Sequence, residues 1–165
     1  MSDYVDTMRQ QWASIYPELD TEAAGVVARI TRIARMIQLR GDVVLAEHGV
    51  TRDEFELMSL LARSAGPLTP SALAASQITS AAAVTKRLKK LDDAGWVRRE
   101  VNPSDGRGAL IHLTQEGSSV LRPIIDAVAK FDSALLGELT ANDSEQLANQ
   151  LRALLTSVEG PAENA

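Results

Sequence analysis

Hydrophobic residues recur at intervals of three and four along most of the chain, which is the spacing of amphipathic α-helices. The longest such stretch runs from about residue 21 to residue 47. A shorter one covers residues 8–16 and is ended by the proline-containing segment 17–20. The last begins at Thr140 and places four leucines on one face: Leu147, Leu151, Leu154 and Leu155. These patterns predict long helices towards both ends of the chain.

The middle of the chain carries the start and stop signals of shorter helices. Thr51 and Glu54 have the spacing of a capping box, so a helix is expected to begin there. Thr69 is followed by proline, which favours another helix start. After a short turn at 77–79, residues 80–94 again have helical spacing and are closed by a glycine. The last two helices, joined by a three-residue turn, are typical of a helix-turn-helix.

The hydrophobic period then changes to that of β-strands. Residues 96–101 and 109–113 are predicted strands, and the turn-forming residues 102–108 between them indicate a β-hairpin. Thr114 is expected to cap a further helix that extends towards Leu136. The predicted fold is therefore mainly α-helical with a small β-hairpin wing.

These elements together indicate a winged helix-turn-helix over residues 51–114. Helical regions at residues 1–48 and 115–165 flank it. A chain of 165 residues is the size of one ordinary domain, so we expect the three parts to form a single domain.

The distribution of charge is more informative than the net charge of −5. Residues 69–113 carry seven basic and four acidic side chains, whereas the segments before and after them both contain an acidic excess. A local basic patch is what attraction to phosphate requires, and the net charge of the whole chain matters less. The predicted winged helix-turn-helix is thus a candidate for binding double-stranded DNA.

The helix predicted at 80–94 has the two faces that a recognition helix needs. Val84, Leu88 and Leu91 form its apolar side, and small residues at its start permit a close approach to bases. The residues expected to contact DNA are Thr79, Ser80, Ala83, Lys86, Arg87, Lys89, Lys90, Arg99 and Arg107. An alternative is an ordinary amphipathic surface helix with solvated lysines. The neighbouring helix and hairpin favour DNA binding.

Several classes of function are disfavoured by what the sequence lacks. Without cysteine there is no disulfide, thiolate metal site or cysteine-based redox sensor, and a cytoplasmic location is expected. No signal peptide or membrane-spanning run is evident. His48 and His112 do not have a metal-binding spacing, and no catalytic motif is present. We therefore expect neither an enzyme nor a metal or cofactor site.

The hairpin residues resemble a family signature. Asp105 and Arg107, followed by five residues and then Leu113-Thr114, are similar to the D-x-R-x5-L-T pattern of MarR-type transcriptional regulators. The resemblance extends over nearly the whole chain. It implies a homodimer, with residues 1–48 and 115–165 as an intertwined helical dimerisation region, and a palindromic DNA operator. It also implies that Asp105 braces the wing and that Arg107 reaches the minor groove.

A narrower resemblance is to the urate-responsive branch of this family, which has an extra N-terminal helix bearing a tryptophan. Trp12, Glu56, Arg87 and Arg99 fall at places similar to the effector-binding residues of that branch, although the branch has Asp where this chain has Glu56. Two guanidiniums can hold a planar anion and an indole can stack on it. The resemblance thus implies a small anionic effector, aromatic or a carboxylate.

The resulting prediction is a homodimeric repressor that a small anion releases from its operator. Two alternatives stay open: a DNA-binding winged helix without ligand control, and a winged helix used for protein contacts. The residues just named also have simpler interpretations. Trp12 can anchor a helix, Arg87 and Arg99 can contact phosphate only, and Glu56 can be a helix-dipole partner.

Overall fold

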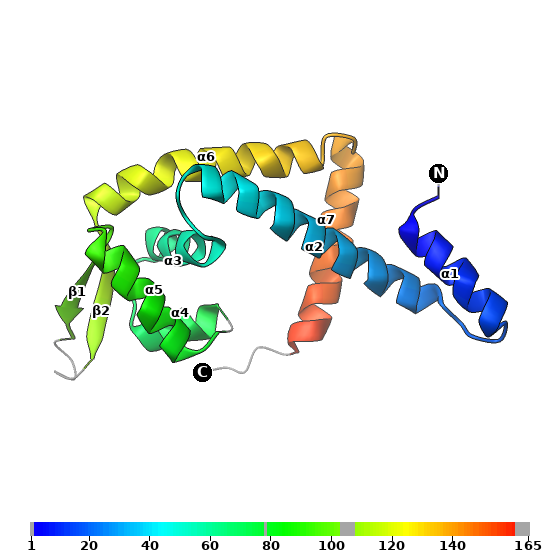
Figure 1. Ribbon diagram of the computed structural model, residues 1–165, viewed down its shortest axis with the longest axis horizontal. Helices are drawn as coiled ribbons and strands as arrows, with labels where there is room; N and C mark the ends of the chain where they lie inside the picture. Colours follow the sequence, from blue (N-terminus) through cyan, green and yellow to red (C-terminus); the bar gives the residue numbers. More distant parts are fainter. Residues whose placement is uncertain (1, 78, 103–107, 161–165) are drawn as a thin grey trace. The chain divides into compact units, whose positions relative to one another are not determined.

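Seven helices and a two-stranded hairpin make up the part of the chain that the computed structural model describes, namely residues 2–77, 79–102 and 108–160. The elements are α1 (Tyr4–Ile15), α2 (Glu22–Glu47), α3 (Arg52–Arg63), α4 (Pro70–Ser76), α5 (Ala81–Asp93), β1 (Val97–Val101), β2 (Ala109–Leu113), α6 (Gln115–Leu135) and α7 (Ala141–Glu159) (Figure 1). This confirms the predicted mainly helical fold with a hairpin wing.

Most helices begin at the capping residues that the sequence indicated. The Thr51 side chain accepts a hydrogen bond from the backbone of Glu54, whose side chain accepts one from the Thr51 backbone. Thr69 and Ser80 also cap α4 and α5, but each through a single hydrogen bond that its side chain accepts from the backbone. Helix α1 begins four residues earlier than predicted, because Asp3 and its partner Asp6 form a second capping box.

The chain divides into two compact units at Leu121, and each is described by itself. The first unit contains the hydrophobic core under the winged helix-turn-helix. Its buried residues come from α3, α4, α5, the hairpin and the start of α6: Leu57, Met58, Leu61, Leu73, Ala74, Val84, Leu88, Leu91, Val97, Ile111 and Leu121. The core thus fixes α5 against α3, α4 and the hairpin.

The hairpin is antiparallel, with Val97 opposite Leu113 and Val101 opposite Ala109. The segment before α4 adds a short third pairing, because Leu68 and Ile111 exchange backbone hydrogen bonds of 2.8 and 3.2 Å. Ile111 is fully buried, so the centre of the hairpin is anchored in the core.

Helix α6 begins in close contact with the start of the hairpin. The Thr114 hydroxyl donates to the Gly95 carbonyl at 2.7 Å and accepts from the Gly117 amide at 2.9 Å. A Cβ atom placed on Gly117 would lie 2.1 Å from the carbonyl oxygen of Trp96, a distance that no side chain can occupy. Gly117 therefore permits this approach.

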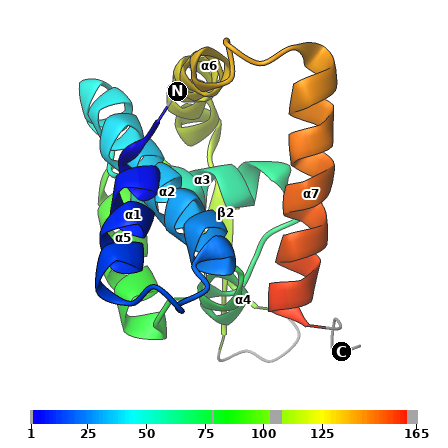
Figure 2. The same ribbon diagram turned by 90° about the vertical axis from the view of Figure 1, so that its right-hand side faces the viewer.

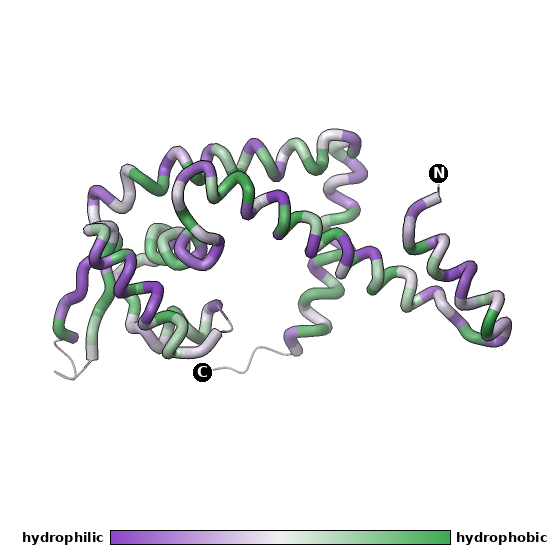
Figure 3. The backbone as a smooth tube through the Cα atoms, in the orientation of Figure 1, coloured by the Kyte–Doolittle hydropathy of each residue, from purple (hydrophilic) through white to green (hydrophobic). Residues whose placement is uncertain are grey.

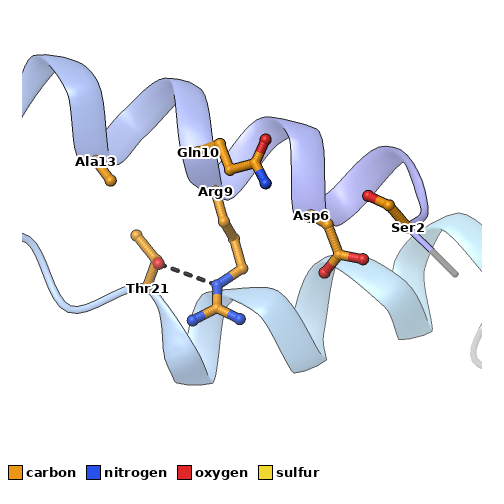
Figure 4. Close-up of a pocket in the computed structure, with 6 residues that line it drawn as sticks. All are labelled: Ser2, Asp6, Arg9, Gln10, Ala13 and Thr21. Carbon is orange, nitrogen blue, oxygen red and sulfur yellow. Dashed lines mark hydrogen bonds between the residues drawn. The ribbon is translucent and has the colours of Figure 1, made fainter.

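Helices α1 and α2 lie side by side in both ribbon views (Figure 2). Arg29 of α2 donates to both carboxylates of the α1 capping box, with its Nε 2.8 Å from Asp3. In the middle of α1, Arg9 Nε donates to Thr21 Oγ1 at 3.1 Å, across a pocket that these two residues help to line (Figure 4). Polar contacts thus hold α1 to α2 at two places.

The second unit contains the C-terminal part of α6 and all of α7. Hydrophobic and hydrophilic residues alternate along α7 (Figure 3), yet none of its residues is buried. Its leucines are 38 to 56% exposed: Leu147, Leu151, Leu154 and Leu155. Among the described residues, no helix combines the length and hydropathy needed to cross a membrane.

Candidate nucleic-acid interface

Helix α5 has one buried and one exposed side, as predicted. Val84, Leu88 and Leu91 are at most 1% exposed. The opposite side borders a shallow hollow shared with the hairpin, lined by Ala82, Thr85, Lys86, Lys89, Asp92, Asp93 and Arg99. A helix anchored by its apolar side, with short and basic side chains on the other, can enter a major groove.

The residues predicted to contact DNA fall into different environments. Ser80 is exposed at the N-cap of α5, and Thr79 and Ala83 are half-buried beside it. Lys86 and Lys89 are exposed along the helix, and Lys89 forms an exposed intrahelical ion pair of 2.7 Å with Asp93. These five positions leave the first turns and the outer side of α5 open to a ligand.

Arg87 and Lys90 differ from the others because they contact α3. Arg87 Nη2 lies 2.6 Å from a carboxylate oxygen of Asp53, and Lys90 Nζ lies 2.6 Å from Glu54 Oε1. Arg87 is half-buried, with 23% of its side chain exposed. Both were predicted to contact DNA, and in this structure they form two ion pairs between α5 and the first turn of α3.

Glu54 is the buried polar residue of this region, at 4% exposure. Burial raises the pKa of its carboxyl, but the Lys90 ammonium and the Thr51 amide stabilise the charged form, and the net result is a lowered pKa. The carboxylate is therefore charged at neutral pH.

The hairpin carries a second group of charges. Arg98 and His112 both lie within 3.0 Å of the same oxygen of Glu100. The Arg98 guanidinium is the main reason that the pKa of Glu100 is lowered. Arg99 lies 3.6 Å from Asp92 at the end of α5. The two wing residues of the family signature, Asp105 and Arg107, fall outside the described residues.

No hydrogen bond, ion pair or ring contact joins the four predicted effector residues to one another. Trp12 stacks on Tyr16 with ring centroids 5.9 Å apart, and α1 lies at the end of α2 away from α3 and α5 (Figure 1). Glu56 is exposed, and the carboxylate that meets Arg87 belongs to Asp53 instead. Arg99 meets Asp92. Within one chain, these four residues therefore do not form a single binding site.

Sequence reasoning missed the acidic partners of the basic residues. Asp53 was not singled out, and Glu54 was expected only as a capping residue. Arg52, next to Asp53, also forms an ion pair of 2.8 Å with Asp42 of α2. The available signal was the helical spacing of Arg87 and Lys90, three residues apart, which places them on one side of α5.

Helices α4 and α5, the turn between them and the hairpin define a winged helix-turn-helix protein. The model of the MarR family matches residues 48–108. The reduced form of MarR from E. coli is 30% identical, with 76% of this chain and 95% of that one covered and a TM-score of 0.64. The chain belongs to the MarR family of winged-helix transcriptional regulators.

Two further similarities extend this result. The chain is 29% identical to the HTH-type transcriptional regulator PecS of Dickeya dadantii over 157 residues, covering 94% of this chain and 92% of the relative. It also shares the fold of MepR from S. aureus, solved as a DNA complex, with 20% identity, a TM-score of 0.67 and coverage of 78% and 93%. PecS is a transcriptional regulator and not an enzyme, as are the members of the matching family, which agrees with the prediction from sequence.

Proposed function

We propose that this protein is a cytoplasmic homodimeric repressor that binds a palindromic DNA operator and is released from it by a small anionic effector. The observation that carries the DNA-binding part is the two-sided helix α5, buried through Val84, Leu88 and Leu91 and open through Lys86 and Lys89. The MepR complex, which has the same fold, supports this use of the fold.

The homodimer is supported by the apolar residues that a single chain leaves exposed. They lie on α1, α2 and α7 and include Tyr4, Val26, Val27, Ile33, Leu39, Val43, Leu151 and Leu155, each at least 44% exposed. Exposed apolar surface of this kind, on each of the two units, is typical of protein interfaces. A two-fold dimer would present two copies of α5, and this matches the symmetry of a palindrome.

The effector part is proposed on the resemblance and on the environment of Arg87. Asp53 lies early in α3 and already neutralises Arg87, whereas Glu56, which the resemblance places at the acidic position, is exposed and forms no ion pair among the described residues. An anion bound to Arg87 would compete with Asp53 and could shift α5. Trp12 and Arg99 would complete such a site only if dimerisation or movement brings them together.

The test of DNA binding uses a duplex selected by the wild-type protein from a random library, with binding measured by gel shift over a range of salt. Lys86→Gln removes an exposed charge from α5, so we expect weaker binding and a salt slope reduced by about one unit. Lys130→Gln, on α6, is the matched control and should leave binding unchanged. Absence of binding to any duplex at low salt would contradict the proposal and favour a protein-contact module.

The test of effector control is a thermal-shift screen of urate, other purines, salicylate-like acids and tricarboxylates. Each ligand that stabilises the protein is then added to the gel shift. We expect at least one anion to raise the melting temperature and to weaken DNA binding, because release requires preference for the non-binding conformation. An anion that binds without changing DNA affinity would remove the effector from the proposal and leave DNA binding intact.

A further inference from the structure

Glu54 uses its two carboxylate oxygens for two different helices. Oε2 accepts the Thr51 amide of the α3 capping box at 2.9 Å. Oε1 meets the Lys90 ammonium of α5 at 2.6 Å. The residue that fixes where α3 begins is therefore also the residue that holds α5.

The two partners differ greatly in their exposure. The Glu54 side chain is 5% exposed and cannot move far, whereas 66% of the Lys90 side chain is exposed. Lys90 is in the last turn of α5, where a positive charge is also favoured by the helix dipole. The fixed carboxylate thus determines the direction of the flexible Lys90 side chain, whose ammonium points towards α3.

A second ion pair lies directly beside the first. It joins Asp53, the residue before Glu54 on α3, to Arg87, which lies one turn before Lys90 on α5. Two adjacent pairs between the start of α3 and the second half of α5 resist rotation of α5 about its own axis better than one pair does. That rotation decides which side chains of α5 face a groove.

We propose that Lys90 is a positioning residue, and that its ion pair with Glu54 sets the orientation of α5 on which discrimination between DNA sequences depends. This rests on the proposed function of DNA binding. It gives Lys90, which the sequence predicted as a DNA contact, a positioning role within the protein. It also gives Glu54, a carboxylate near a DNA-binding helix, a role that favours DNA recognition in spite of its charge.

The sign of the effect distinguishes positioning from simple electrostatics. Removing a negative charge close to the DNA should strengthen binding to every duplex if only long-range attraction matters. If Glu54 positions α5, removing the charge should weaken binding to the selected duplex while a scrambled duplex is bound as well as before or better.

The experiment compares Glu54→Gln, Lys90→Gln and Asp93→Asn on the selected duplex and on a scrambled duplex of the same length. The glutamine at 54 retains an oxygen for the Thr51 amide, so the cap is kept. Asp93→Asn is the charge-matched comparison, because Asp93 pairs only within α5, with Lys89, among the described contacts. It is expected to tighten both duplexes equally.

For Glu54→Gln and Lys90→Gln we expect the preference for the selected duplex to fall about five-fold or more, the effect of one charge-assisted hydrogen bond. The double variant should be no worse than either single variant, because both remove the same pair. The salt slope of Lys90→Gln should match that of the wild type, whereas loss of a phosphate contact would lower it by about one unit.

The proposal is overturned if Glu54→Gln binds both duplexes as Asp93→Asn does, or if Lys90→Gln loses affinity equally for both with a reduced slope. Lys90→Gln keeps the test valid if Glu54→Gln fails to fold, since Lys90 is exposed. Hydrogen exchange of free protein gives a readout without DNA: both variants should lower protection in α5 more than in α4. Unchanged protection would contradict the pair's role even if no duplex is bound.

Discussion

Gly117 and Thr114 show how single residues position the wing. Thr114 ties the hairpin to α6 through its hydroxyl, and Gly117 lets the first turn of α6 pass the Trp96 carbonyl. The family signature ends at this threonine, and the structure gives a local reason for it. The glycine three residues later was not singled out in the sequence, because its requirement comes from packing against a distant segment.

Gly117→Ala is expected to destabilise the fold by roughly 2 kcal/mol, because a methyl group would have to displace backbone in a packed region. Urea unfolding followed by circular dichroism measures this. Gly137→Ala is the matched control: its nearest contact would be an ordinary 3.5 Å, and its effect should stay within about 0.5 kcal/mol. Equal stability of the two variants would contradict the close approach.

At the scale of elements, α1 is held to α2 by charge. The pKa of Asp3 is lowered first by the Asp6 amide and then by Arg29, and that of Asp6 first by the Asp3 amide and then by Arg29. A lowered pKa in the folded protein means that the contact stabilises the fold at neutral pH and that this contribution is lost as pH falls through the folded pKa. The attachment of α1 should therefore weaken in acid.

Arg29→Gln tests this attachment. At pH 7 we expect lower hydrogen-exchange protection in residues 4–15, because both carboxylates lose their common partner. The difference from wild type should shrink below the ordinary aspartate pKa of about 3.9 and vanish as the pH falls through the lowered pKa of the two carboxylates. Arg35→Gln, at an arginine of α2 with no ion pair among the described residues, is the control and should not change α1. A difference independent of pH would argue against the charge mechanism.

At the scale of the whole molecule, the exposed apolar positions on α7 are the clearest sign of association. None of its 19 residues is buried, although four leucines share the helical spacing of a packed face. Covering such a face with another surface is favourable in water, so it marks a site of association. A second copy of this chain is the partner we propose.

Leu151→Asp combined with Leu155→Asp should shift the protein from dimer towards monomer, measured by sedimentation velocity at several concentrations. DNA binding should weaken as well, because each half-site would be bound independently. Gln150→Asp adds a charge to an exposed polar position of the same helix and should leave the dimer intact. A wild-type protein that sediments as a monomer at all concentrations would contradict the proposed dimer.

Local signals explain what the sequence allowed us to predict. Capping residues such as Thr51 and Thr69 mark helix starts within a few positions of their effect, and the hairpin was indicated by its turn residues. The start of α1 was missed because acidic capping residues at Asp3 and Asp6 were read only as polar residues. The buried side of α5 was predicted from the helical spacing of its apolar residues.

The partners of the basic residues could not be predicted in the same way. Asp53 and Arg87 are 34 positions apart, and Glu54 and Lys90 are 36 apart, so their contacts depend on how two helices pack. Sequence spacing shows on which side of a helix a lysine lies, but not whether a carboxylate of another helix lies next to it. For that reason, the sequence could not distinguish a solvent-exposed lysine that contacts phosphate from a lysine paired with another helix.

The double use of Glu54 has a consequence for the divergence of related sequences. A capping residue is usually replaceable, because several side chains serve a helix start at similar cost. Here a replacement at position 54 also alters the orientation of α5. It is therefore tolerated only with a compensating change at Lys90 or with a change in the operator that the protein prefers. Positions 54 and 90 should therefore be inherited together, and lineages in which both have changed are where new operator preferences are expected to have arisen.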